Sequence, residues 1–419
     1  MVDVKEIIGN LGRSEPIAVN LAGYIKQAID TSKEGGQVDD RFLCAVLITL
    51  ASPDSRDLHL FRVAIGYLAP LISPRYLSLL LFQLLSSYDD QALYVLLQAS
   101  DAKRYIEDSS LTTEQIESGN FDVLTSFARF LRLIGQDSLD HPEFELDRKK
   151  MEERRCKIFQ CAKLMIDFGA NMNRTFMLPS RLGNGEHHVV ALHTMAEACI
   201  QGGSPLMNLI MESTFIENCV NDKMPMTPVY TTIEEICHCD SSRIHHITSM
   251  IEFCAIPLLK CGIKAEPDFL EPKEGECLKE SLYNLLESNF RDDIEFVIWS
   301  HRGTTLFNFL LESRQKSTFN YGLFRQGVMN HVNTLLIPLI LRNDIKKQDR
   351  LVRMVANILL MAKCSVPMRL QSLCRIAVLN QLPVGLKQRR EAIDSLPLPS
   401  LFKRFLNFHD LKVKNPSKL

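Results

Sequence analysis

Leu370-Gln-Ser-Leu-Cys374-Arg-Ile-Ala-Val378 is the stretch that decides the fold at the C-terminal end of this chain of 419 residues. Leu370, Cys374 and Val378 are spaced four residues apart. Leu373 and Ala377 fall between them, so a helix over this stretch carries all five residues on one apolar stripe. We expect a helix with such an apolar stripe to dock into a groove of a partner protein.

The residues that flank this stretch predict a short series of elements. Ser365 suits the helix cap, and Pro367 suits the first turn. Pro383 and Gly385 then end the helix. Leu396-Pro-Leu-Pro399 forms a corner that proline fixes, with Ile393 before it and Phe402, Phe405 and Leu406 after it. The predicted order is helix, turn, short helix, corner and helix.

The helix and the corner together resemble a SOCS box, and the resemblance covers residues 365–408. In that family the first half, the BC box, binds Elongin C, which travels with Elongin B. The resemblance implies that Elongin C contacts the apolar stripe, which consists of Leu370, Leu373, Cys374, Ala377 and Val378. Arg369 departs from the family pattern, which usually has a small residue before the key leucine.

The second half resembles the cullin box that selects cullin-5 together with its RING subunit. The matching residues are Ile393, Leu396, Pro397, Leu398, Pro399, Phe402, Phe405 and Leu406. The resemblance implies a substrate-recognition subunit of a ubiquitin ligase, which presents a bound protein for ubiquitination. Ubiquitin transfer would then depend on proximity rather than on a side chain of this protein. The identity of the protein substrate is not encoded in any motif.

A second hypothesis assigns the C-terminal segment a purely internal role. An apolar stripe at helical spacing is ordinary core in any helical protein. The chain would then be a non-catalytic helical-repeat scaffold whose C-terminal helices only cap the stack. Exposure separates the two hypotheses, because an open stripe favours docking and a covered stripe favours capping.

The composition is typical of a globular intracellular protein. Apolar residues make up 46% of the chain and charged residues 23%. The net charge of −2 provides no basic field, so we expect no nucleic-acid partner. Apolar runs such as 76–85 and 332–341 are about half the ~20 residues that span a bilayer, and no secretory signal opens the chain, so we expect no membrane partner. The expected location is the cytoplasm, with the nucleus in addition, and the 12 cysteines are expected to be reduced and mostly buried.

The N-terminal part of the chain has the apolar periodicity of short helices. We expect helices over 42–48, 58–71, 76–86 and 91–98, with turns at Ser52-Pro53 and Ser73-Pro74. The charged stretch 136–155 is expected to begin as a loop and to end as the solvated start of a helix.

Four short motifs in the middle of the chain resemble ankyrin repeats. Gly169 and Gly262 each follow an apolar helical run and predict a helix end with positive φ. Val190-Ala-Leu-His193 and Thr227-Pro-Val-Tyr230 resemble the openings of repeats, and they are spaced near the ~33-residue ankyrin period. Insertions are expected around 178–188 and 234–249. With the C-terminal segment, the chain resembles the ankyrin repeat and SOCS box family.

The predicted fold is therefore all-α: a helical-repeat stack with degenerate ankyrin repeats and a C-terminal three-helix SOCS box. The predicted domains are an N-terminal helical region (1–135), a charged linker (136–155), degenerate ankyrin repeats (156–312), connecting helices (313–363), the SOCS box (364–410) and a tail (411–419).

A third hypothesis is a zinc-dependent hydrolase built on Cys237-His-Cys239, His245-His246 and Cys254. The Cys-x-Cys gap is tighter than in ordinary zinc hairpins, and adjacent histidines on a helix point about 100° apart. We therefore expect an insertion loop there. The sequence also lacks the Gly-x-Ser-x-Gly nucleophile motif and a P-loop. The sequence thus predicts no catalytic residue, no metal and no cofactor.

Overall fold

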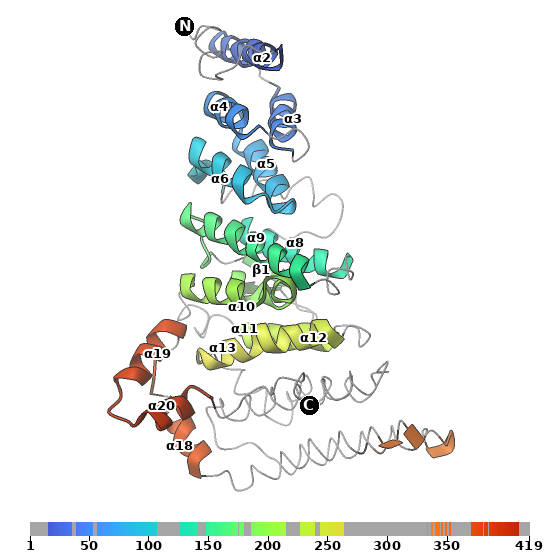
Figure 1. Cartoon of the computed structure of the whole chain (residues 1–419), viewed down its shortest axis with the longest axis vertical. Helices are drawn as coiled ribbons and strands as arrows, with labels where there is room; N and C mark the ends of the chain where they lie inside the picture. Colours follow the sequence, from blue (N-terminus) through green and yellow to red (C-terminus); the bar gives the residue numbers. More distant parts are fainter. Residues whose placement is uncertain are drawn as a thin grey trace. The chain divides into compact units, whose positions relative to one another are not determined.

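The computed structural model describes residues 16–35, 39–52, 57–106, 126–140, 148–174, 176–179, 186–214, 227–238, 244–263, 333, 337, 340–343, 345–346, 348–349, 352, 370–379, 381–383 and 385–409. The chain divides into two compact units, Met1–Met177 and Leu178–Leu419. Figure 1 shows the order of the elements along the chain.

The described residues of the first unit are helical. The elements are α2 (Pro16–Lys33), α3 (Asp40–Ala51), α4 (Leu58–Leu68), α5 (Pro74–Ser86), α6 (Asp90–Ala99), the 3-10 turn η1 (Ala102–Arg104), α8 (Ser126–Asp140) and α9 (Arg148–Asp167). The four helices predicted between residues 42 and 98 are confirmed as α3 to α6. Their starts follow ordinary capping chemistry, because Asp39, Asp57 and Asp89 each accept backbone N–H groups of the first turn. Pro74 opens α5 as the predicted turn requires.

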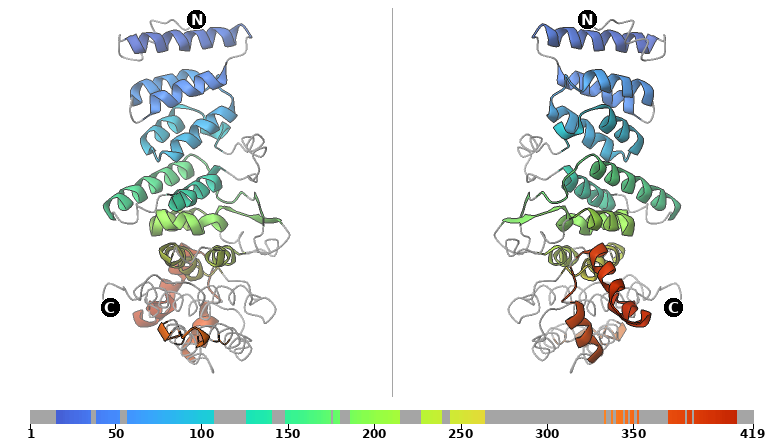
Figure 2. Two further views of the ribbon diagram at one scale, coloured as in Figure 1. Left: turned by 90° about the vertical axis from the view of Figure 1, so that its right-hand side faces the viewer. Right: turned by 90° about the vertical axis from the view of Figure 1, so that its left-hand side faces the viewer.

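The helices of the first unit form two layers. Helices α3, α5 and α8 lie side by side in one layer, and α2, α4, α6 and α9 lie side by side in the other (Figure 2). Consecutive helices, α3 with α4, α5 with α6 and α8 with α9, pack against each other across the layers. The side chains between the layers are fully buried and apolar, and include Leu47, Phe61, Leu80, Leu96 and Ile134.

The charged stretch 136–155 differs in part from its prediction. Helix α8 continues to Asp140, so the first residues of the stretch are helical rather than a loop. The apolar side chains Phe127, Phe130, Leu131 and Ile134 of α8 are buried. The later part starts α9 in solvent, as predicted, where exposed Lys149 pairs with Glu153 and exposed Glu152 pairs with the half-buried Arg155.

Both predicted glycine helix ends are confirmed. Gly169 follows α9 with φ of 104°, and the Ala170 N–H donates to the Met165 carbonyl. In the second unit Gly262 follows α13 (Ile256–Lys260) with φ of 88°, and the Ile263 N–H donates to the Leu258 carbonyl. Both ends have the six-residue closure of the Schellman motif, which requires a left-handed residue.

The second unit starts with an element that the all-helical prediction lacks. Strands β1 (Phe176–Pro179) and β2 (Glu186–Val189) pair in a two-stranded sheet, and they lie where the insertion around 178–188 was predicted. The helices that follow are η3 (Ala191–Thr194), α10 (Met195–Ser213), α11 (Pro228–His238), α12 (Ile244–Met250), the π-helical turn η5 (Ile251–Ala255) and α13. Within α10, Gly203 has a φ of 59° and breaks the helix.

The predicted insertion loop around 234–249 is largely helical instead. It lies in the end of α11 and in α12, and residues 239–243 between them fall outside the described part of the chain. Ile236 and Ile247 are buried, so the segment contributes to the core and takes the helical form that packing requires. None of the helices within the described ranges has the length and apolar character needed to cross a bilayer.

The chain ends in helices α18 (Leu370–Leu379), α19 (Leu386–Ser395) and α20 (Ser400–Leu406), which we call the C-terminal bundle. Helix α20 packs against both α18 and α19, and α19 also contacts α10. The predicted order of helix, turn, short helix, corner and helix is confirmed.

Candidate functional site

Helix α18 has two different faces. Arg375 and Leu379 are buried in the C-terminal bundle. Cys374 and Ala377 are exposed, and Val378 is half-buried. Two of the three described residues of the predicted Elongin stripe are therefore open to solvent, and the third is partly covered.

Some predicted features of this helix lie outside the described residues, namely Ser365, Pro367 and the side chains of Leu370 and Leu373. The predicted helix end is located more closely by the structure. Helix α18 stops at Leu379, before Pro383, and Gly385 is the cap residue at the start of α19. Gly385 has a φ of 130°, which side-chain-bearing residues rarely adopt.

A buried arginine forms the centre of the bundle. The guanidinium carbon of Arg375 lies 3.6 Å from the ring centre of Phe405 and 4.9 Å from that of Phe408. The side chain is 0% exposed. A guanidinium is weakly hydrated and stacks favourably on aromatic faces, so a cation is tolerated here. Sequence analysis missed this residue because a charged side chain contradicts an apolar pattern, and the i, i+3 pair of phenylalanines was the available signal.

Apolar side chains complete the interior of the bundle. Ile393 is 1% exposed, and Leu379, Leu406 and Phe408 are also buried. The sequence assigned Ile393 to the cullin-binding set, and the structure places its side chain in the interior of the bundle.

The Leu396–Pro399 corner presents an apolar surface. Leu396 has φ of −63° and ψ of 139°, and Pro399 caps α20 in a similarly extended conformation. The exposed fractions are 38% for Leu398, 71% for Leu401 and 55% for Phe402. These three side chains are the corner patch. Sequence analysis named Leu398 and Phe402 and missed Leu401, although its place between the corner and Phe402 could have indicated it.

Other predicted residues of the corner are less prominent. Pro397 and Pro399 are exposed, whereas Leu396 and Phe405 are half-buried. The ammonium of Lys403 donates to the Asp394 carbonyl near the end of α19. The hydrogen bond ties α20 to α19 and fixes the angle at which the corner patch is presented.

The cysteines fit the prediction of reduced, mostly buried thiols. The seven described cysteines are free, and Cys156 and Cys374 are the exposed ones. Burial raises the pKa of Cys44 to about 11 and that of Cys161 and Cys261 to about 12. These thiols are therefore protonated at neutral pH and lack the thiolate that nucleophilic catalysis needs.

The zinc hypothesis finds no support within the described residues. No group of three metal-ligating side chains occurs among them. The side chains of Cys237, Cys239 and His245 lie outside the described positions. Cys254 is buried, and its sulfur lies 3.3 Å from the Thr232 hydroxyl.

Comparison with known proteins identifies the C-terminal segment. Residues 366–407 match the family model of the SOCS box. No curated protein and no solved structure matches the chain. SOCS boxes bind Elongin C with Elongin B, and cullin-5, and the proteins that carry them are non-catalytic adaptors of ubiquitin ligases. The bundle of α18, α19 and α20, with its open stripe and its corner patch, is therefore a SOCS box, and Elongins B and C and cullin-5 are its partners.

Proposed function

We propose that this protein is the substrate-recognition subunit of a cullin-5 RING ubiquitin ligase, which binds a protein through its helices and presents it for ubiquitination. The observation that carries the proposal is the exposure of both docking surfaces. Cys374 and Ala377 on α18 are exposed, and so is the corner patch. A helix that only capped a stack would bury these positions against its own chain.

The described interior of the SOCS box is filled by residues other than the exposed Cys374, Ala377 and corner patch. Arg375, Leu379, Ile393, Leu406 and Phe408 fill the interior. We assign Leu370, Leu373, Cys374, Ala377 and Val378 to Elongin C, and the Leu396–Pro399 corner with Leu401 and Phe402 to cullin-5. Ile393 and Phe405 support the corner from the interior of the bundle instead of contacting cullin-5 directly. Fully desolvated apolar anchors of this kind usually provide most of the binding free energy at an interface.

We further propose that η3 to α13 are two degenerate ankyrin repeats. The N–H of Val190 donates to Nδ1 of His193 at 3.2 Å, which rigidifies the first opener. The break at Gly203 divides α10 into two helical parts. In the second opener α11 starts at Pro228, and Gly262 lies just beyond the end of α13 at Lys260. These features support a repeat of two helices, and the domain boundaries predicted from the sequence stay predictions.

Affinity purification of the full chain tests the proposal. The wild type should retain Elongins B and C and cullin-5, and the double variant Leu370→Ala/Cys374→Phe should retain ~30- to ~1,000-fold less Elongin C. Cys156→Phe is the matched control, because Cys156 is also an exposed helical cysteine. Equal recovery of the Elongins with the double variant and the control would contradict the assignment of the stripe.

A further inference from the structure

A second buried arginine of the SOCS box lies outside its core. Helix α19 carries three basic residues, of which Lys387 and Arg390 are exposed, whereas Arg389 is only 7% exposed. This burial holds the charge of Arg389 away from water and lowers its pKa. A buried charge is retained only where nearby groups compensate for the lost hydration.

The guanidinium of Arg389 lies at the carboxyl ends of two helices. Its Nη2 donates to the carbonyl of Leu379, the last residue of α18, at 3.2 Å. Its Nη1 packs against Gly262, where a Cβ atom would overlap it. Gly262 follows Cys261, the cap residue at the end of α13. Carboxyl ends of helices carry partial negative charge and unpaired carbonyl groups, so they compensate a buried cation.

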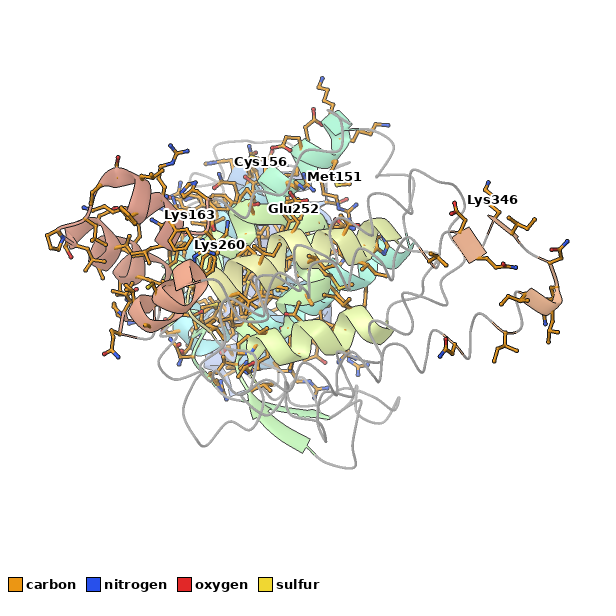
Figure 3. All side chains as sticks on the ribbon, turned by 90° about the horizontal axis from the view of Figure 1, so that it is seen from below. Met151, Cys156, Lys163, Glu252, Lys260 and Lys346 are labelled. Carbon is orange, nitrogen blue, oxygen red and sulfur yellow. The ribbon has the colours of Figure 1, made fainter. Side chains whose placement is uncertain are left out.

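A backbone hydrogen bond forms a second connection at the same place. The N–H of Gly385, at the start of α19, donates to the carbonyl of Cys261 at 2.9 Å. The Cys261 thiol in turn donates to the sulfur of Met211 in α10, at 3.3 Å. In Figure 3 the labelled Lys260, the last residue of α13, lies on the side of α13 that faces the C-terminal helices. The start of α19 is therefore fixed to the α10–α13 part of the second unit.

Two glycines make this close approach possible. Gly262 has a φ of 88° and Gly385 a φ of 130°, so both adopt backbone conformations that other residues rarely reach. Gly262 also leaves the space that the guanidinium fills. The same residue thus ends α13 and admits Arg389.

We propose that Arg389 is a positioning residue, which locks the SOCS box onto the end of α13 and so sets the direction in which Elongin C and cullin-5 are held relative to helices α10–α13. The inference rests on the proposed function, since ubiquitin transfer by proximity depends on this direction. We call the contact of Arg389 with Gly262 and of Gly385 with Cys261 the box clamp. The box clamp is separate from the stripe and from the corner patch, so its loss should spare partner binding.

Hydrogen exchange of the full chain in complex with Elongins B and C tests the inference. In Arg389→Ala the amide of Gly385 and the segment 257–263 should exchange at least ~10-fold faster than in the wild type, with Elongin and cullin-5 affinity within ~2-fold. Arg390→Ala, the neighbouring exposed arginine, should behave as the wild type. Unchanged exchange at Gly385 and 257–263 in Arg389→Ala would overturn the inference.

A second variant keeps the test decisive if Arg389→Ala fails to fold. Gly262→Ala lies outside the box and should also loosen the clamp, because the added methyl group displaces the guanidinium. Gly169→Ala is its matched control, with a φ of 104° and open space at the Cβ position. The increase in exchange at Gly385 should appear with Gly262→Ala and not with Gly169→Ala. Equal exchange with both variants would contradict the clamp.

Different results would refute the proposed function and the proposed role of the box clamp. If the wild type did not bind the Elongins, the proposed function would be refuted. The box clamp would still be tested, by measuring the exchange at Gly385 on the free chain. A reconstituted ligase allows a further measurement, the choice of ubiquitinated lysine, which a loss of stability alone would not change. In Arg389→Ala we expect the distribution of ubiquitin between Lys260 and the box residue Lys387 to change by several-fold, and an unchanged distribution would overturn the positioning role.

Discussion

Two arginines show how single residues determine the SOCS box. Arg375 is enclosed by Phe405 and Phe408, and Arg389 by the ends of α13 and α18. The observed neighbours that compensate these charges are aromatic π-faces for Arg375 and helix carboxyl ends for Arg389. Neither role follows from the hydrophobic pattern, because that pattern treats arginine as a surface residue.

Replacement of Arg375 by alanine should destabilise the SOCS box. The variant loses a desolvated cation–π contact of about 2 kcal/mol and leaves a cavity between the two phenylalanines. Urea unfolding followed by hydrogen exchange in 370–379 measures the loss. Arg390→Ala removes an exposed arginine from the same bundle and should change the free energy of unfolding by less than about 0.5 kcal/mol. Equal effects of the two variants would show that Arg375 does not support the core.

Cysteine alkylation provides a direct footprint of Elongin C. Cys374 and Cys156 are both exposed in the free chain and should both react at pH 8. Binding of Elongins B and C should protect Cys374, because it lies on the stripe, and leave Cys156 reactive. Mass spectrometry of the alkylated peptides reports both sites in one sample. Continued alkylation of Cys374 in the saturated complex would exclude it from the Elongin contact.

At the scale of elements, the positions of several helices follow from local sequence patterns. The apolar periodicity of α3 to α6 was sufficient to predict these helices, and the aspartate caps before three of them are a local signal that the prediction did not use.

Replacement of the helix cap Asp39 by alanine tests this local account. Its carboxylate accepts the N–H groups of Arg41 and Phe42. Loss of these hydrogen bonds should cost about 1 kcal/mol in the unfolding of the first unit. Asp101→Ala is the control, because Asp101 precedes η1 without a side-chain cap hydrogen bond. Thermal or urea unfolding of the full chain compares the two, and an equal loss would contradict the capping role.

Other elements were mispredicted for physical reasons that can be named. Strands β1 and β2 are too short to show a period-two pattern, so the sequence revealed only an insertion there. The Cys- and His-containing stretch around α11 and α12 has few apolar residues, yet Ile236 and Ile247 are enough to bury it as helix. The helix that carries the docking stripe was predicted and is observed as α18, whereas the burial of Arg375 on another face of that helix was not predicted.

At the scale of the whole molecule, the two-layered arrangement of the first unit had no counterpart in the sequence analysis. Periodicity predicts that a helix has an apolar face and does not indicate which other helix covers it. The pairing of α3 with α5 and of α4 with α6 depends on contacts between residues distant in sequence. Under the proposed function these helices bind and position a protein, and the chemistry of ubiquitin transfer belongs to the ligase partners.

The central claim is that the two halves of the SOCS box hold different partners, Elongin C on α18 and cullin-5 at the corner patch. It is tested most directly by replacing Leu396, Pro397, Leu398 and Pro399 together by alanine in the full chain and measuring retained Elongins B and C and cullin-5 in one pull-down. The account predicts Elongin recovery within ~2-fold of the wild type and cullin-5 recovery reduced by ~30-fold or more. Loss of both partners together, or of neither, would contradict it.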